Sequence, residues 1–368
     1  MKLAIVHDYL NQYGGAERVV ETLHEVFPQA PVYTSIYLPW KMPETFKNMQ
    51  IRTSFMQKLP FLERHFKKYL MLYGRAIRSL DLTGYDVILS SSSAFAKAAR
   101  VDGGTLHLCY CYTPMRFAWN YSDYVEKEDF SPLTKKVLPL LIHRLRRWDL
   151  KANSGVHSFI AISEYIRKRI LRCYGRESVV IYPPVNTGDF TISTEPGEYF
   201  LVVSRLNAYK RIDIVVEAFN ELGLPLRIIG EGPYRQNLER RSGPNIRFLG
   251  RVDENTLRRS YSRCRALIFP GSEDFGIAPV EAQACGRPVI AYAAGGALET
   301  VVDGVTGLFF TEPNPRSIVE TVGRFTAAES RFQPERIKKN ADAFDKEKFK
   351  AGIREFVRRK YAQSKQQG

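Results

Sequence analysis

Short apolar runs that end in turn residues alternate with longer stretches of helical periodicity along the whole chain. The apolar runs of the first half are KLAIVH, YDVILSSS, TLHLCYCY, HSFIAIS and SVVIYPP. Those of the second half are YFLVVS, LRIIG, NIRFLG, RALIFP and RPVIAY. Helical stretches such as GGAERVVETLHEVF and KRIDIVVEAFNEL follow them. This alternation predicts strand–helix–strand units, and continuously apolar strands are typical of parallel sheets covered by helices on both faces.

The two series are separated by a weakly patterned stretch near residues 183–198, which begins with two prolines. A chain of 368 residues is also longer than one ordinary domain core. We therefore predict an α/β protein of two doubly wound, Rossmann-like domains, over 1–185 and 195–340, that face each other across a cleft. A basic amphipathic helix at about 345–365 either completes the second domain or packs back on the first.

Composition narrows the class of protein. The chain has 44% hydrophobic and 25% charged residues, which excludes a disordered or collagen-like chain. No apolar run reaches the roughly 18 residues of a membrane span, and His7 and Asp8 interrupt the apolar N-terminus where a signal peptide would continue. We therefore expect a cytoplasmic protein. Five scattered cysteines predict neither a disulfide nor a structural metal.

The net charge of +15, from 54 basic and 39 acidic residues, indicates an anionic partner. Nucleic acid, a phosphorylated substrate and an acidic membrane surface all fit. Residues 53–82 combine Phe, Leu, Met and Tyr with cations such as Arg64, Lys67 and Lys68, and contain few acids. That mixture suits a lipid headgroup boundary, although a buried helical hairpin explains its apolar half equally well.

Candidate binding residues follow the predicted strands, because ligands of open parallel sheets bind at the carboxyl ends of the strands. After the first strand, Gly14 and Gly15 open a helix and allow the backbone to approach a ligand closely. In the second series, Arg205 and Lys210 flank a loop that leads into a helix. Two cations beside a helix N-terminus are unfavourable unless an anion such as a diphosphate lies between them; the alternative is two surface side chains that point away from each other.

Two further turns occupy the same position in the topology. Gly230 to Pro233 form a tight turn after LRIIG, and the loop at Arg251 and Val252 follows NIRFLG. Main-chain donors beside a flat apolar slot commonly hold a nucleobase, so a base bound at residues 251 and 252 is one interpretation; ordinary surface turns are the alternative for both stretches.

The stretch GSEDFGIAPVEAQACG separates two glutamates by seven residues. Pro279 suits the first position of a helix, which predicts Glu273 on the preceding loop and Glu281 in the first turn. Between them, Phe275, Gly276 and Ile277 would present backbone N–H groups. Because carboxylates accept hydrogen bonds from paired hydroxyls, we expect one glutamate to hold a sugar and the other a ribose.

In combination these motifs resemble the retaining GT-B glycosyltransferases of glycosyltransferase family 4. The stretches VHDYLNQYGGAERVVE, CYCYTPMRFAWN and ISEYIRKRI are most similar to bacterial mannosyltransferases of O-antigen and exopolysaccharide assembly. The resemblance implies a metal-independent hexosyltransferase that moves mannose from GDP-mannose to a polyprenyl-diphosphate-linked saccharide. It also implies peripheral association with the inner face of the cell membrane, where segment 53–82 would dock.

The resemblance also implies roles for single residues. Arg205 and Lys210 would grip the donor diphosphate, Glu273 would hold the sugar hydroxyls and Glu281 the ribose, and Gly15 would approach the phosphate. Many relatives carry a histidine where this chain has Tyr112, so we expect Tyr112 to act as a neutral hydroxyl donor.

Other functions remain open at this level. The donor is a different GDP- or UDP-sugar in one alternative, and in another the chain is a sugar-nucleotide epimerase, which needs no acceptor. A phosphorylase would need a pyridoxal phosphate lysine, which the sequence does not identify. A basic nucleic-acid-binding protein fits the charge, but the aromatic residues are dispersed and no nucleic-acid module is recognisable.

Overall fold

The computed structural model describes residues 1–119, 132–193, 195 and 197–367. Four of the residues used above lie wholly or partly outside the described part. These are Asn120 at the end of CYCYTPMRFAWN, Thr194 and Pro196 in the predicted linker, and the side chain of Lys67. The chain divides into two compact units. Unit 1 comprises Met1–Pro184 with Glu347–Gly368, and unit 2 comprises Val185–Lys346.

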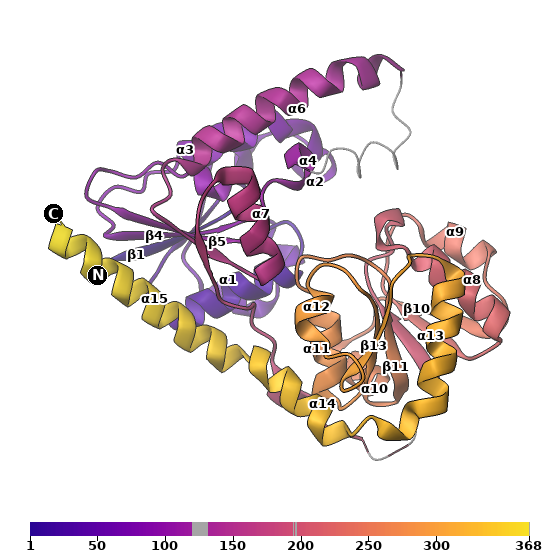
Figure 1. The fold of residues 1–368 in the computed structure, drawn as a ribbon. Coiled ribbons are helices and arrows are strands. Elements are labelled where there is room, and N and C mark those ends of the chain that lie inside the picture. The colour runs from indigo at the N-terminus through magenta and orange to yellow at the C-terminus, as the bar shows by residue number, and fades with distance from the viewer. Residues whose placement is uncertain (120–131, 194, 196, 368) are drawn as a thin grey trace. The chain divides into compact units, whose positions relative to one another are not determined.

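Unit 1 is built on a seven-stranded sheet with the order β3-β2-β1-β4-β5-β6-β7. Its strands are β1 (Leu3–His7), β2 (Val32–Thr34), β3 (Ile51–Thr53), β4 (Val87–Ser92), β5 (Leu106–Cys111), β6 (Ser158–Ala161) and β7 (Ser178–Val180). Its helices are α1 (Gly15–Val26), α2 (Leu62–His65), α3 (Tyr73–Arg78), α4 (Arg116–Trp119), α6 (Pro132–Asn153) and α7 (Glu164–Tyr174). Figure 1 shows α3 and α6 on one face of this sheet and α1 on the other. All residues of β1, β4 and β5 are therefore buried.

Unit 2 is built on a six-stranded sheet with the order β10-β9-β8-β11-β12-β13. Its strands are β8 (Tyr199–Val203), β9 (Leu226–Ile229), β10 (Ile246–Gly250), β11 (Cys264–Phe269), β12 (Val289–Tyr292) and β13 (Gly307–Phe310). Its helices are α8 (Ile212–Leu222), α9 (Arg235–Arg240), α10 (Glu254–Ser262), α11 (Ile277–Ala284), α12 (Ala297–Thr300), α13 (Pro315–Ala328) and α14 (Pro334–Ala341). Phe200, Phe219 and Phe325 are among the residues of its core.

Every strand pairing within both sheets is parallel, which confirms the predicted pair of doubly wound α/β domains. In unit 1 the strand order reverses between β1 and β4, and in unit 2 it reverses between β8 and β11. Loops that diverge at such a point leave room for a ligand at the carboxyl edge of the sheet. The candidate residues follow strands that end at these two edges.

The last helix, α15 (Lys346–Gln367), packs on unit 1 from Glu347 onward. The ring of Phe349 meets that of Tyr110 edge-on at 5.5 Å, and Lys350 lies 3.4 Å from the carboxylate of Glu25 on α1. Figure 1 shows this helix running along the unit that contains the N-terminus. The chain thus returns to its first unit after completing the second.

The basic and apolar segment 53–82 forms short helices instead of a helical hairpin. These are η3 (Phe55–Lys58), α2, η4 (Phe66–Leu72) and α3. Tyr73, Ala76 and Ile77 of α3 belong to the core of unit 1, whereas Phe55, Phe61 and Met71 are exposed. In the described part of the chain, no helix combines the length and the apolar content that crossing a membrane would require.

Candidate active site

Three loops at the carboxyl edge of the unit 2 sheet are joined by backbone hydrogen bonds. After β8, the Leu206 N–H donates to the carbonyl of Glu231 over 2.9 Å, and the Tyr234 N–H donates to the carbonyl of Leu206 over 3.0 Å. The Gly230 N–H donates to the carbonyl of Gly250 over 2.8 Å. The Arg205 loop, the Gly230 turn and the loop of Arg251 and Val252 are therefore neighbours in one unit.

Glycine is required in this arrangement because the loops approach so closely. Gly230 has φ +132°, and a Cβ there would lie 1.9 Å from the carbonyl oxygen of Ser204. A Cβ on Gly232 would lie 2.2 Å from the carbonyl oxygen of Leu206. Side chains at these positions would push the loops apart. Gly230 thus packs one loop on another, and its predicted contact with a donor remains a prediction.

Lys210 and Glu273 form an ion pair at the centre of this edge. Lys210 ends the short helix η7 (Ala208–Lys210) after β8, and Glu273 lies on the loop after β11, the neighbouring strand. The side chain of Lys210 is 10% exposed, whereas that of Glu273 is 26% exposed. The structure therefore brings together two residues that the sequence singled out separately. The ion pair with Glu273 holds the side chain of Lys210 in position.

Tyr209 lies between the two predicted diphosphate ligands. Its ring is 5.3 Å from Nζ of Lys210, and its hydroxyl is 3.4 Å from Nη2 of Arg205. Arg205 itself is exposed. Sequence reasoning missed Tyr209, although its position next to Lys210 in the loop was a usable signal.

The predicted start of the helix after Glu273, at Pro279, is wrong. Helix α11 begins at Ile277, after Gly276 with φ +94°, so Pro279 is its third residue and not its first. Glu281 consequently lies in the second turn. It is 6% exposed, and its Oε2 accepts a hydrogen bond from the hydroxyl of Tyr261 on α10 over 2.7 Å. A ribose at Glu281 would have to share the carboxylate with this tyrosine.

The loop that carries Glu273 is held by a pair of glycines after β12. The Gly296 N–H donates to the carbonyl of Glu273 over 2.8 Å, and a Cβ on Gly295 would lie 2.3 Å from that carbonyl oxygen. Phe275 points inward and is buried against Phe344, with 5.5 Å between the rings. Sequence reasoning missed Gly295 and Gly296. Their signal, a Gly pair between a strand and a helix, is the one that identified Gly14 and Gly15.

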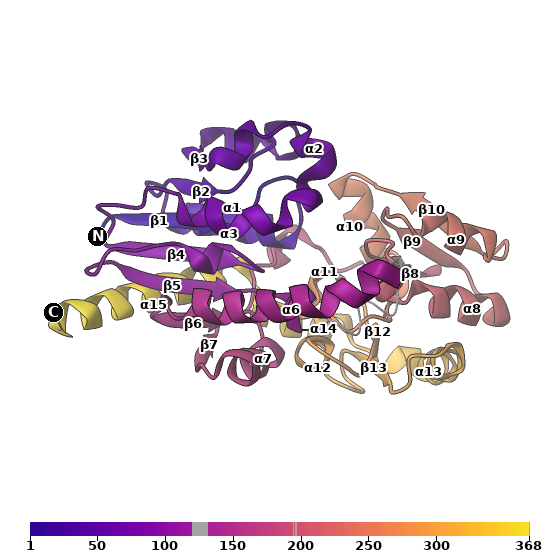
Figure 2. The same cartoon turned by 90° about the horizontal axis from the view of Figure 1, so that it is seen from above.

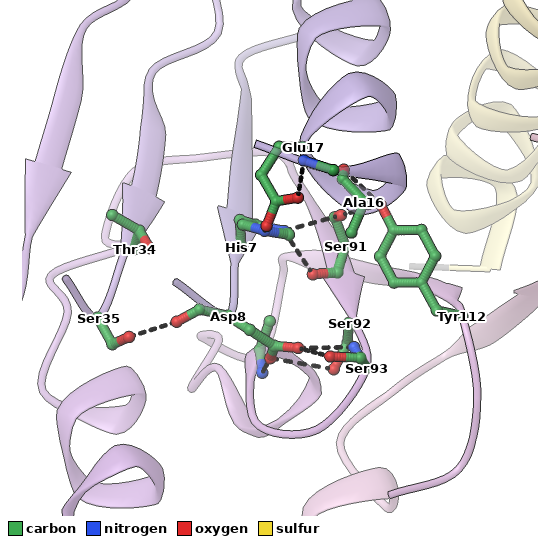
Figure 3. Close-up of polar contacts among 12 residues, drawn as sticks. His7, Asp8, Ala16, Glu17, Thr34, Ser35, Ser91, Ser92, Ser93 and Tyr112 are labelled. Atoms are coloured by element: carbon green, nitrogen blue, oxygen red, sulfur yellow. Dashed lines mark hydrogen bonds and ion pairs between the residues drawn. The ribbon is translucent and has the colours of Figure 1, made fainter. Parts of the chain in front are cut away.

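Gly14, Gly15 and Tyr112 lie at the carboxyl edge of the unit 1 sheet. Gly14 is the N-cap of α1, and its N–H donates to Oε2 of Glu17 over 2.9 Å. The Tyr112 hydroxyl donates to the carbonyl of Ala16 over 3.0 Å and lies 2.7 Å from Oγ of Ser91 (Figure 3). Burial raises the pKa of Tyr112 well above its ordinary value, so the hydroxyl stays neutral.

His7 completes this cluster. Its Nδ1 lies 3.1 Å from the carbonyl oxygen and 3.0 Å from Oγ of Ser91, and its Nε2 lies 3.8 Å from Oε1 of Glu17 (Figure 3). Because a carbonyl only accepts, we assign a proton to Nδ1. The side chains of His7 and Glu17 are almost fully buried. The sequence identified neither residue as part of a site.

Asp8 fixes the loop after β4. Its carboxylate accepts the backbone N–H groups of four consecutive residues, Ser93 (2.6 Å), Ala94 (3.0 Å), Phe95 (2.7 Å) and Ala96 (2.6 Å). The Ser93 hydroxyl also donates to it over 2.7 Å. With so many donors, this buried carboxylate serves to position the loop at the switch point between β1 and β4. Across the described residues, no group of three His, Cys, Asp or Glu side chains is arranged to hold a metal ion.

Two family models match the chain in succession. Residues 13–189 match the model described as Glycosyltransferase Family 4, and residues 190–344 match Glycosyl transferases group 1. An uncharacterized glycosyltransferase of Methanocaldococcus jannaschii is 30% identical over 178 residues, which are 46% of this chain and 50% of that protein. A GDP-mannose-dependent alpha-(1-6)-phosphatidylinositol monomannoside mannosyltransferase of Mycolicibacterium smegmatis is 27% identical over 223 residues, 52% of this chain and 57% of that protein. The matches thus span about half the length of these relatives.

Two solved structures share the fold over nearly the whole chain. Sucrose-phosphate synthase from Thermosynechococcus elongatus has a TM-score of 0.78 at 18% identity and covers 98% of this chain and 100% of its own. Anabaena HepE in complex with UDP and glucose has a TM-score of 0.74 at 18% identity and covers 97% of this chain and 99% of its own. At this level of identity the similarity shows the fold alone.

Proposed function

Given that the chain belongs to glycosyltransferase family 4, we propose that it transfers mannose from GDP-mannose to a polyprenyl-diphosphate-linked saccharide, with retention of configuration. The observation that carries this proposal is the buried Lys210 paired with Glu273 at the carboxyl edge of a doubly wound sheet. The name of the mycobacterial relative, a GDP-mannose-dependent mannosyltransferase, supports the choice of donor.

The donor diphosphate would bind at the loop after β8. In the proposed transfer, the bond between the anomeric carbon and the diphosphate breaks while a bond to the acceptor hydroxyl oxygen forms on the same face. The departing phosphate takes the acceptor proton. Negative charge grows on the diphosphate during this step, and fixed cations stabilise it most when they need not move. Lys210, held by Glu273, meets that requirement, and the exposed Arg205 would add a second cation.

The remaining contacts follow the same edge. Glu273 would accept hydrogen bonds from sugar hydroxyls, assisted by backbone N–H groups of Phe275 to Ile277, and Glu281 would bind the ribose beside Tyr261. The backbone at Arg251 and Val252 would receive the base. These roles need no metal ion, because the cations and helix N-termini supply the positive charge.

A thermal-shift panel of GDP-sugars and UDP-sugars tests the donor. A ligand that binds only the folded chain must raise Tm, so GDP-mannose is expected to give the largest shift. A UDP-sugar donor is the second candidate, since the neighbouring HepE structure contains UDP and glucose. A larger shift with a UDP-sugar would refute the choice of GDP-mannose, and no shift with any nucleotide sugar would refute the proposed donor site.

Substitution then tests the diphosphate contacts. Arg205→Ala and Lys210→Met are each expected to lower turnover about 10²- to 10⁴-fold, because several kcal/mol of transition-state stabilisation is lost. Arg316→Ala is the matched control, since Arg316 is exposed on α13, where its Nε lies 2.9 Å from the carboxylate of Glu320. Normal turnover in Arg205→Ala or Lys210→Met would remove that residue from the site. Incubation with donor alone, followed by a search for an isomerised nucleotide sugar, separates the transferase from an epimerase.

We also propose that the acceptor, a lipid-linked saccharide, lies at the inner face of the cell membrane, and that segment 53–82 of unit 1 docks on that membrane. Its support is the combination of cations and exposed apolar side chains in that segment.

A further inference from the structure

The exposed Trp and Phe side chains in the described part of the chain all come from one stretch of unit 1. They are Trp40 (67% exposed), Phe55 (44%) and Phe61 (75%), and Met71 (57%) follows shortly after them. Single exposed aliphatic side chains are common on protein surfaces and need no explanation. A tryptophan and a phenylalanine that are both mostly exposed, about twenty residues apart, do need an explanation, because these rings have a large apolar surface.

Trp40 and Phe61 lie on neighbouring segments. Trp40 belongs to η1 (Pro39–Lys41), and Phe61 is the residue immediately before α2. Glu63 on α2 connects them, because its Oε1 accepts a hydrogen bond from Nε1 of Trp40 over 3.4 Å and lies 3.1 Å from Nζ of Lys41. Figure 2 shows α2 and β3 on the same side of unit 1, beyond β2. The two exposed rings therefore belong to one surface.

The backbone of Phe61 is strained. Its φ is +51°, and among the described non-glycine residues only Phe61 and Arg211 have a positive φ. A bulky residue rarely adopts this left-handed conformation, which is energetically unfavourable. The preceding Pro60 is held by the Tyr69 hydroxyl, which donates to its carbonyl over 2.8 Å. The ring of Phe61 meets that of His65 edge-on at 6.5 Å and is still 75% exposed. The strained backbone therefore holds a ring that is not part of the core.

The same stretch is strongly basic. Residues 39–72 contain seven Lys or Arg and two Glu. Lys41, Arg64 and Lys68 are exposed on the elements that carry or flank the two rings. Aromatic rings flanked by exposed cations match the boundary of an anionic bilayer, where rings enter among the headgroups and cations meet the phosphates. The excess of positive charge favours an anionic lipid surface over a protein partner as the occupant.

We propose that Trp40 and Phe61 insert into the headgroup region of an anionic phospholipid bilayer, with Lys41, Arg64 and Lys68 contacting lipid phosphates. This proposal identifies the membrane surface that would carry the lipid-linked acceptor, and in that respect it rests on the proposed function. It also changes the predicted docking region. Trp40 lies outside residues 53–82, and residues 73–82 contribute to the core of unit 1 instead.

Vesicle flotation of the full-length chain tests the proposal without any donor. Vesicles of phosphatidylglycerol and phosphatidylethanolamine are compared with vesicles of phosphatidylcholine at low salt. The wild type is expected to bind the anionic vesicles at least about tenfold better, with binding that weakens as salt is added. A blue shift of tryptophan fluorescence on binding, which Trp40→Phe abolishes, is the expected sign of insertion.

Phe61→Gly separates membrane contact from folding. Glycine adopts φ +51° without strain, so this variant is expected to keep or raise Tm while its affinity for anionic vesicles falls about fivefold or more. Arg64→Glu combined with Lys68→Glu is expected to lower affinity at least as much. The controls are Leu249→Ser, an exposed apolar side chain on β10, and Arg316→Glu, an exposed cation on α13; both belong to unit 2.

Three results would overturn the proposal. They are equal binding to both vesicle types, wild-type binding by Phe61→Gly, and a loss of binding in Arg316→Glu as large as in the double charge variant. The last would mean attraction to net charge alone. Since the thermal-shift panel needs no vesicles and flotation needs no nucleotide sugar, failure here leaves the donor assignment standing, and the reverse also holds.

Discussion

Removal of the buried cation Lys97 is predicted to destabilise unit 1. Nζ of Lys97 lies 2.8 Å from Oδ1 of Asp149, and both side chains are completely buried. Oδ2 of Asp149 accepts hydrogen bonds from Nε1 of Trp119 over 2.8 Å and from the hydroxyl of Tyr174 over 2.7 Å. One carboxylate on α6 therefore ties together the short helix η5 (Ala96–Ala98), α4 and α7.

The cost of Lys97→Met follows from the charge left behind. Without the lysine, Asp149 keeps two neutral donors but loses its only cation within ion-pair distance among the described residues. Breaking a buried pair from one side costs about 3–5 kcal/mol of unfolding free energy. Lys97→Met combined with Asp149→Asn removes both charges and leaves an acceptor for Trp119 and Tyr174. We expect the double variant to be at least about 1 kcal/mol more stable than the sum of the single changes implies.

Urea unfolding followed by tryptophan fluorescence measures the stability of unit 1, which contains Lys97 and Asp149. All three tryptophans, Trp40, Trp119 and Trp148, belong to unit 1, so the signal does not report on unit 2. An unfolding free energy for Lys97→Met within about 1 kcal/mol of the wild type would refute the reasoning, as would simple additivity in the double variant.

The pH dependence provides an independent check on the same pair. Burial opposes the charge on Lys97, but the attraction of Asp149 outweighs it, so the pKa of Lys97 lies above its ordinary value of 10.5. A pKa raised in the folded state means stability that is present below the unfolded pKa and lost as pH rises through the folded one. The stability of the wild type relative to Lys97→Met should therefore shrink above about pH 10.5. A constant difference would contradict the assignment.

Three other predictions concern the candidate site. Tyr112→Phe should lower turnover about 10²-fold, and it should also cost about 1–3 kcal/mol of unfolding free energy because Ser91 and Ala16 lose their hydrogen-bond partner; unchanged turnover would remove Tyr112 from the site. Gly230→Ala should lower Tm and donor affinity together, because its Cβ would collide with the carbonyl of Ser204; wild-type affinity by calorimetry would show that the loop spacing is unimportant. Activity should persist in EDTA, and a loss reversed by Mg²⁺ would contradict charge stabilisation by Arg205 and Lys210 alone.

The sequence predicted strands from the apolar runs of the chain, and it missed three strands, Val32–Thr34, Ile51–Thr53 and Gly307–Phe310. Length does not separate the two groups, because β7 has only three residues and was predicted from the run SVVIYPP. Two of them extend one side of the unit 1 sheet, and the third ends the unit 2 sheet. The fold class did not depend on them.

For the candidate site, the loops could be predicted but the pairings of side chains could not. Every parallel strand ends at the same edge, so the loops after β8 to β11 had to meet. Which side chains pair there depends on packing between distant residues. The hydroxyl of Tyr261 reaches Glu281 from another helix, and Asp8 binds backbone groups 85 to 88 residues further along the chain. One sequence carries no signal for such contacts.

The start of α11 shows how one local rule can override another. Proline at the first helical position is a common pattern, and it predicted a start at Pro279. Gly276 instead adopts φ +94°, and the helix begins directly after it at Ile277. Proline is also tolerated elsewhere in the first turn, where N–H groups have no partner within the helix. The left-handed glycine, which only the backbone geometry reveals, decided the boundary.

The charges of two equivalent loops indicate which unit receives the anionic part of a donor. Each loop follows the strand beside which the sheet order reverses, β1 in unit 1 and β8 in unit 2. Residues 8–14 contain one acid and no Lys or Arg, whereas residues 204–211 contain three Lys or Arg and no acid. A diphosphate would be repelled by the first loop and attracted by the second. The N–H of Gly14 already donates to Oε2 of Glu17 over 2.9 Å. The difference in charge therefore supports the proposal that the diphosphate binds at the loop that carries Lys210.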